Sequence, residues 1–269
     1  MSKWVILSSD KNEQYSFLLP ITVRAWQNLG FKPLIMLVGD ETEWHNDKSC
    51  QRVLQALDDI QDKLIVFIPK LDGYNIWTTA NIVRLFPGCL NLPDNDYALI
   101  GDVDLWVLRP SYINDVQWDK PVHLWYSNAF EQNSKIAQYP MCHVGMTLQT
   151  WREVIGVTVS DIYDTTQRMM DIDGKHSDKD VFFNEKYFAK KLQLWPGYPD
   201  KIQFIPRPEK KPEYPADRLC RTDWNLTQLD TATDTHLPRP PRENRKLIWP
   251  VLCKVLTPDQ IEWANDYWK

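Results

Sequence analysis

The stretch ALIGDVDLWVLRP, Ala98–Pro110, holds two aspartates one residue apart between two apolar runs. The letters ALI predict a buried strand that ends near Gly101, and LWVL predicts that the apolar chain resumes after Asp104. Carboxylates this close repel one another unless a cation lies nearby. One divalent cation bound to both would remove the repulsion, and hard oxygen ligands favour magnesium or manganese over zinc. Short acidic pairs also occur by chance, so the position after a buried strand is what favours a cation site.

The chain before this stretch alternates between strand-like and helix-like patterns. Strands are expected at Trp4–Ser9, Lys32–Asp40, Lys63–Pro69 and Asp96–Leu108. Helices are expected at Asn12–Gly30, Cys50–Leu57 and Tyr74–Phe86. This order predicts a doubly wound α/β fold with a mostly parallel central sheet and helices on both faces. Pro20 inside the first helical pattern predicts a kink or a late helix start.

After Pro110 the pattern is less regular. Strands are expected at Lys120–Ser127 and Met141–Thr150, and helices within Trp151–Ile172, Asp178–Lys191 and Pro258–Lys269. No linker or repeat separates the two halves. A single domain over residues 1–269 is therefore expected.

Composition excludes several functional classes. The chain has 269 residues, of which 43% are hydrophobic and 25% charged, which is typical of a globular protein and argues against disorder. A net charge of -5 and basic residues broken up by prolines argue against a nucleic-acid partner. No apolar run is long enough to span a membrane, and no secretion signal is apparent. Five scattered cysteines without a CxxC pair favour a reducing compartment, so a cytoplasmic location is expected.

Polar residues gather where the expected strands end. Ligands of open α/β sheets bind beyond the carboxyl ends of the strands. The residues at these ends are Ser8, Ser9, Asp10, Gly39, Asp40, Asp102 and Asp104. This edge of the sheet is therefore the candidate site.

Other phosphate-handling classes lack their motifs. Trp106 stands in mid-chain where a haloacid-dehalogenase-type phosphatase needs a small or β-branched residue near its N-terminus. The chain has no GxxxxGK[ST] loop, and no GxGxxG follows the first strand. Kinase-like and dinucleotide-dependent activities are therefore not favoured.

Four segments resemble the GT-A fold glycosyltransferases, most closely glycosyltransferase family 8 and its relatives. They are Asn81–Pro110, with an arginine-bearing helix before the DxD strand; Met141–Val154; His176–Phe188; and Asp234–Pro241. The sequence departs from the family pattern at His143, usually Asn, and at Lys179, usually Gln. It also lacks the glycine and lysine that follow the family's late histidine. The resemblance extends over about residues 1–245 and implies a GT-A fold.

The resemblance implies a nucleotide-sugar donor, with a UDP-sugar expected, and a glycan or other hydroxyl acceptor. Residues 1–115 would form the nucleotide-sugar half, 116–245 the acceptor half, and 246–269 a C-terminal segment. The implied donor-binding residues are Ser8, Ser9, Asp10, Tyr15, Arg84, Asp102, Val103, His143 and Gly145. The implied ligands of Mn²⁺ or Mg²⁺ are Asp102, Asp104 and His236. Arg84 suits phosphate or sugar because its donors form a planar fork, although a surface ion pair is the simpler explanation.

The implied catalytic acids are Asp178 and Asp180, on the acceptor side, where helix capping is the simpler explanation. A carboxylate there would accept the acceptor's proton or stabilise a cationic sugar. The resulting expectation is a metal-dependent hexosyl- or pentosyltransferase of glycan biosynthesis. Two alternatives stay open: a sugar-phosphate nucleotidyltransferase, which normally has a glycine-rich loop that SSDKNEQ lacks, and a non-catalytic carbohydrate-binding relative.

Overall fold

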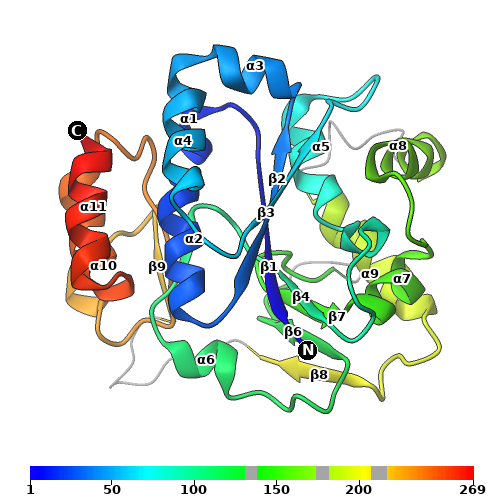
Figure 1. Cartoon of the computed structure of the whole chain (residues 1–269). Coiled ribbons are helices and arrows are strands. Elements are labelled where there is room, and N and C mark those ends of the chain that lie inside the picture. Colours follow the sequence, from blue (N-terminus) through cyan, green and yellow to red (C-terminus); the bar gives the residue numbers. More distant parts are fainter. Residues whose placement is uncertain (131–137, 174–181, 207–216) are drawn as a thin grey trace.

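A seven-stranded central sheet organises the chain, in the order β3-β2-β1-β4-β7-β6-β8 (Figure 1). The computed structural model describes residues 1–130, 138–173, 182–206 and 217–269. The strands of this sheet are β1 (Lys3–Ser9), β2 (Lys32–Val38), β3 (Leu64–Ile68), β4 (Tyr97–Ile100), β6 (Val122–Trp125), β7 (Val144–Thr147) and β8 (Ile202–Ile205).

Most neighbours in this sheet run parallel. β1 pairs in parallel with β2 and β4, β2 with β3, and β6 with β8, whereas β7 runs antiparallel to both of its neighbours. The central strands are apolar because both faces of the sheet are covered; all four residues of β4 are buried. The predicted α/β class with a mostly parallel sheet is confirmed.

Helices cover both faces of the sheet (Figure 1). α2 (Leu19–Asn28) and α4 (Lys48–Asp58) pack into one apolar core, and the opposite core contains α5 (Ile76–Val83), α7 (Leu148–Ile155) and α9 (Phe183–Leu194). The other α-helices described are α1 (Glu13–Ser16), α3 (Glu41–Asn46), α6 (Pro110–Asn114), α8 (Ile162–Asp173), α10 (Arg245–Val255) and α11 (Pro258–Trp268). The described residues also include the 3-10 turns η1 (Pro87–Cys89) and η3 (Leu226–Gln228).

The expected first helix is interrupted before Pro20. α1 ends at Ser16, and α2 begins at Leu19 with Pro20 in its first turn. Proline is tolerated there because the amide hydrogens of the first turn lack intrahelical acceptors in any case. The predicted late helix start is therefore confirmed.

The expected strand Asp96–Leu108 is two strands in two sheets. β4 ends at Ile100, and the chain turns through Gly101–Asp104 before β5 (Leu105–Val107) begins. β5 belongs to a separate three-stranded sheet with β10 (Asp234–His236) and β9 (Arg218–Cys220), in the order β5-β10-β9. The two aspartates therefore lie at the junction of the sheets.

None of the helices in the described part of the chain combines the length and apolar character that a membrane span requires.

Candidate functional site

A pocket of about 490 Å³ opens where the two sheets meet. β1, α1, α5, the turn after β4, α9 and the region around β9 and β10 all contribute to its walls. The lining residues are Ser8, Ser9, Asp10, Asn12, Tyr15, Trp77, Ala80, Asn81, Arg84, Asp102, Val103, Asp104, Asn184, Glu185, Arg221, His236 and Arg239.

Strand register explains why the first strand and the aspartates meet. β1 and β4 are parallel neighbours with Ile6 opposite Ile100, and the Gly101 amide donates to the Ile6 carbonyl at 2.9 Å. If this register is continued, the ends of both strands lie at the same edge of the sheet. Asp102 lies just beyond the end of β4, and Ser8 lies near the end of β1. The pocket thus lies beyond the carboxyl ends of parallel strands, where α/β sheets bind ligands.

Asp102 forms an ion pair with Arg84, the residue that follows α5. Burial by itself would raise the pKa of Asp102, but the nearby guanidinium outweighs that effect and the pKa is lowered. The carboxyl group therefore stays ionised. Arg84 is 8% exposed, so its position in the pocket wall is held by surrounding structure as well as by the ion pair.

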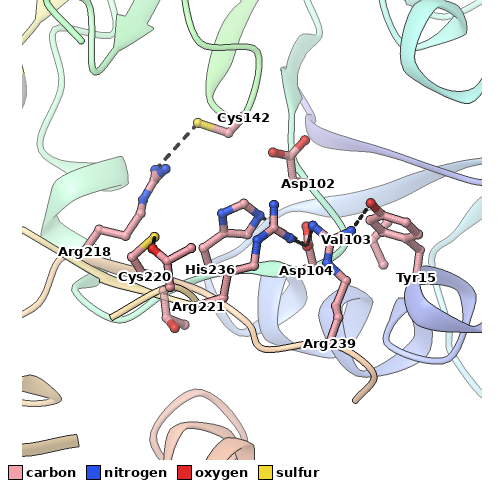
Figure 2. A network of polar contacts seen from close by, with 12 residues as sticks. Tyr15, Asp102, Val103, Asp104, Cys142, Arg218, Cys220, Arg221, His236 and Arg239 are labelled. Carbon is pink, nitrogen blue, oxygen red and sulfur yellow. Dashed lines mark hydrogen bonds and ion pairs between the residues drawn. The ribbon is translucent and has the colours of Figure 1, made fainter. Parts of the chain in front are cut away.

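Asp104 is surrounded by three cationic or titratable side chains. Its Oδ2 atom lies 3.1 Å from Arg221 Nη1, 3.2 Å from Arg239 Nη2 and 3.2 Å from His236 Nε2. Figure 2 shows these three side chains converging on Asp104, with Asp102 to one side. One buried carboxylate is thus the centre of a cationic cluster.

The same carboxylate also changes the pKa of His236. Burial lowers the pKa of His236, but the hydrogen bond and the negative charge of Asp104 outweigh burial, and the pKa is raised above its usual value. His236 reaches Asp104 because β10 pairs with β5 antiparallel, with His236 opposite Leu105.

The residues expected to bind a cation fit one in part. A carboxylate oxygen and an imidazole nitrogen 3.2 Å apart can share one ion, and the arginines on Asp104 show that positive charge is favoured there. Among the described residues, no three His, Cys, Asp or Glu side chains form a ready metal site. Asp102 is instead ion-paired with Arg84. Mn²⁺ or Mg²⁺ binding by Asp102, Asp104 and His236 stays a prediction.

The donor-binding residues expected at the first strand also line the pocket. Ser9 Oγ donates to the carbonyl of Asp10 at 2.9 Å, and Asp10 Oδ1 accepts from the amide of Asn12 at 3.0 Å. Arg239 donates a hydrogen bond from Nη1 to the hydroxyl oxygen of Tyr15, and its guanidinium lies 4.4 Å from the centroid of the Tyr15 ring. Val103 lies between the aspartates, and its carbonyl accepts from Thr22 Oγ1 at 2.5 Å.

His143 and Gly145, also expected to bind the donor, are not among the lining residues of this pocket. His143 is fully buried, and a Cβ atom at position 145 would lie 2.1 Å from the hydroxyl of Tyr97. Glycine is therefore needed to accommodate Tyr97 in the core, and the close approach is to this side chain rather than to a ligand. Donor binding by His143 and Gly145 stays a prediction.

The expected catalytic residues Asp178 and Asp180 lie outside the described residues, and their role stays a prediction. Sequence reasoning missed eight lining residues: Asn12, Trp77, Ala80, Asn81, Asn184, Glu185, Arg221 and Arg239. Helical spacing to Arg84 would have indicated Trp77, Ala80 and Asn81. Arg239 follows His236 by three residues, whereas no local pattern points to Arg221.

No family model and no curated protein matches the chain. A solved glycosyltransferase structure is similar to the chain in fold. GlyE of Streptococcus pneumoniae TIGR4 aligns over 100% of this chain with 13% identity and a TM-score of 0.50. The galactosyltransferase LgtC aligns over 88% of this chain and 87% of its own, with 11% identity and a TM-score of 0.48. This chain covers 64% of the GlyE chain. At such identities the likeness is one of fold.

Proposed function

We propose that the protein is a GT-A glycosyltransferase of the family 8 type. It moves a hexosyl or pentosyl unit from a nucleotide diphosphate sugar, with uridine as the expected base, to a hydroxyl of a glycan or other acceptor. The observation that supports this most strongly is the pocket beyond β1 and β4, in which Arg84, Arg221 and Arg239 lie beside Asp102 and Asp104. Arginine forks match diphosphate oxygens, and the fold agrees with those of glycosyltransferases.

The chain's own residues supply the electrostatics of such a transfer. When the bond between sugar and diphosphate breaks, negative charge grows on the departing diphosphate, and fixed cations beside it lower the barrier. A divalent cation bound by Asp102, Asp104 and His236 would supply further Lewis-acid stabilisation of that charge. Arg84 reaches the same region from α5 and orients the donor through its planar fork.

The acceptor side depends on carboxylates near α9. Glu185 lines the pocket in the first turn of this helix, and its charge also favours the charged form of Arg84. Asp178 and Asp180 precede the same helix in sequence. In an inverting reaction one carboxylate accepts the acceptor's proton, whereas in a retaining reaction it stabilises a cationic sugar and its removal costs less. NMR of the product anomer, with the rates of Asp178→Asn and Asp180→Asn, distinguishes these mechanisms.

A thermal-shift panel of nucleotide sugars with Mn²⁺ or EDTA tests the proposed function. A ligand that binds the folded state alone raises the melting temperature by mass action. We expect a UDP-sugar with Mn²⁺ to raise it most, and the same pair to release UDP in the presence of an acceptor hydroxyl. If no nucleotide sugar shifts the melting temperature, the proposal is wrong. Pyrophosphate release from a nucleoside triphosphate would support the nucleotidyltransferase, and glycan binding without nucleotide would support the non-catalytic relative.

A further inference from the structure

Asp104 presents one oxygen to three positively charged or titratable groups. Arg221, Arg239 and His236 all lie within 3.2 Å of its Oδ2 atom, and the side chain of Asp104 is 5% exposed (Figure 2). A divalent cation that binds Asp104 would share this carboxylate with the two guanidinium groups on Oδ2. Their positive charges therefore compete with a cation for the negative charge of Asp104.

The two arginines are held unequally. Arg239 also contacts Tyr15 through its hydroxyl and its ring face, so it has a second anchor when it leaves Asp104. Arg221, by contrast, donates among the described residues only the hydrogen bond from Nη1 to Asp104, and the Arg221 side chain is 32% exposed. A guanidinium has five N–H donors, so most donors of Arg221 remain for another ligand.

The charges of these arginines affect the binding of two ligands, a divalent cation and a diphosphate. A cation entering alone would be repelled by Arg221 and Arg239, whereas a diphosphate entering alone would face the carboxylates of Asp102 and Asp104. When both enter together, the cation takes the carboxylate and the arginines turn to the phosphate oxygens, so that every charge keeps an opposite partner.

We propose that Arg221 and Arg239 are built-in counter-ions of Asp104 that compete with a divalent cation for this carboxylate and are transferred to the diphosphate when both ligands bind. The pocket then selects the cation and the nucleoside diphosphate as a pair. This inference rests on the proposed function, because it takes a nucleoside diphosphate as the ligand.

The coupling is reciprocal, since each ligand raises the affinity for the other by the same factor. Isothermal titration calorimetry with Mn²⁺ alone, UDP in EDTA, and UDP in saturating Mn²⁺ measures it. For the wild type we expect UDP to bind at least about tenfold more tightly with Mn²⁺ than without.

The deciding variants are Arg221→Gln and Arg239→Gln, which should change the two affinities in opposite directions. Mn²⁺ alone should bind more tightly, by on the order of fivefold, because a competitor is gone. UDP in Mn²⁺ should bind about tenfold more weakly, because a charged donor is lost. Arg221→Lys keeps the positive charge and should restore wild-type affinity for Mn²⁺ alone. Arg168→Gln, on the exposed side of α8, is the matched charge control.

A wild type that binds UDP with Mn²⁺, combined with arginine variants whose affinity for Mn²⁺ alone is unchanged or weaker, would overturn the inference and leave the proposed function intact. A wild type that binds no UDP under either condition contradicts the proposed function and overturns the transfer to diphosphate with it. Thermal melts of each variant identify any that does not fold, and the other arginine then provides the test.

Discussion

Strand β10 contributes to two clusters of similar composition with different surroundings. The pocket cluster consists of Asp104, His236, Arg221 and Arg239, and the buried cluster consists of Asp234, His143, Arg218 and Cys142. Asp234 and His236 are two residues apart and share one side of the strand. In the buried cluster, Arg218 donates two hydrogen bonds of 2.7 Å to Asp234.

The buried cluster is closed by aromatic rings. Arg218 lies 4.5 Å from the Tyr126 ring centroid, and the rings of Trp26 and Tyr112 contact His143. The pocket cluster has one carboxylate for three donors and remains open to the cavity. Residue type alone therefore does not identify a site here: in the closed cluster the bidentate pair of Arg218 and Asp234 balances both charges, whereas the open cluster has donor capacity left for a ligand.

The largest expected effect comes from breaking the buried pair. Asp234→Asn leaves the Arg218 guanidinium without its counter-ion, and burial makes this costly. We expect the free energy of unfolding to fall by about 4 kcal/mol in urea titrations. Asp230→Asn is the matched control, because the Asp230 side chain is 93% exposed beside Lys254 and should leave stability unchanged. Equal stability of both variants would show that the buried pair is not structural.

Disrupting the pocket cluster should lower the rate of sugar transfer rather than the stability of the fold. Asp104→Asn removes the charge that the cation and the arginines share, so transfer should fall by about 100-fold. Initial rates with Mn²⁺ and a UDP-sugar measure this, with circular dichroism to establish the fold. Asp94→Asn is the control, since the 70% exposed Asp94 side chain lies outside the pocket lining. Wild-type rates in Asp104→Asn would refute the role of this aspartate.

The buried cluster should also make the protein sensitive to acid. Burial lowers the pKa of His143 to about 4, and the 3.9 Å separation from Asp234 does not offset this. His143 is then neutral when folded and charged when unfolded below its ordinary pKa, so the loss of stability begins as the pH falls below about 6.5 and continues to about 4. From pH 7 to 5 we expect His143 to account for about 2 kcal/mol of lost stability.

Urea titrations of wild type and His143→Leu at both pH values give the free energy of unfolding. The contribution of His143 is the difference between the two proteins in how much this free energy changes with pH. His45→Gln is the control, because the His45 side chain is 58% exposed. The same pH dependence in wild type and His143→Leu would show that His143 titrates normally in the folded state.

The smallest expected effect tests the role of the planar guanidinium groups in the pocket. Arg84→Lys keeps the charge beside Asp102 but loses the planar fork, so we expect KM for the donor to rise by about tenfold with little change in stability. Steady-state kinetics with varied donor measure it. Arg168→Lys provides the control, since it makes the same exchange on an exposed face of α8. An unchanged KM would make Arg84 a structural partner of Asp102.

Local pattern was sufficient to predict most strands of the central sheet, the late start of α2 and the edge at which polar residues gather. Apolar runs of strand length, helical periodicity and a proline are signals within one segment, and the carboxyl ends of parallel strands meet by topology. The aspartates after β4 could therefore be assigned to the pocket before any contact was known.

Only the tertiary structure decided which charged groups meet those aspartates. Arg221 comes from the turn after β9 and reaches Asp104 across 117 residues, a contact that no local spacing encodes. His143 and Gly145 belong to a segment that resembles an acceptor-side strand, but the rings of Trp26 and Tyr97 pack against them. Periodicity determines which face of a strand is buried. Whether a buried polar residue borders a pocket or a core depends on what the rest of the chain packs over it.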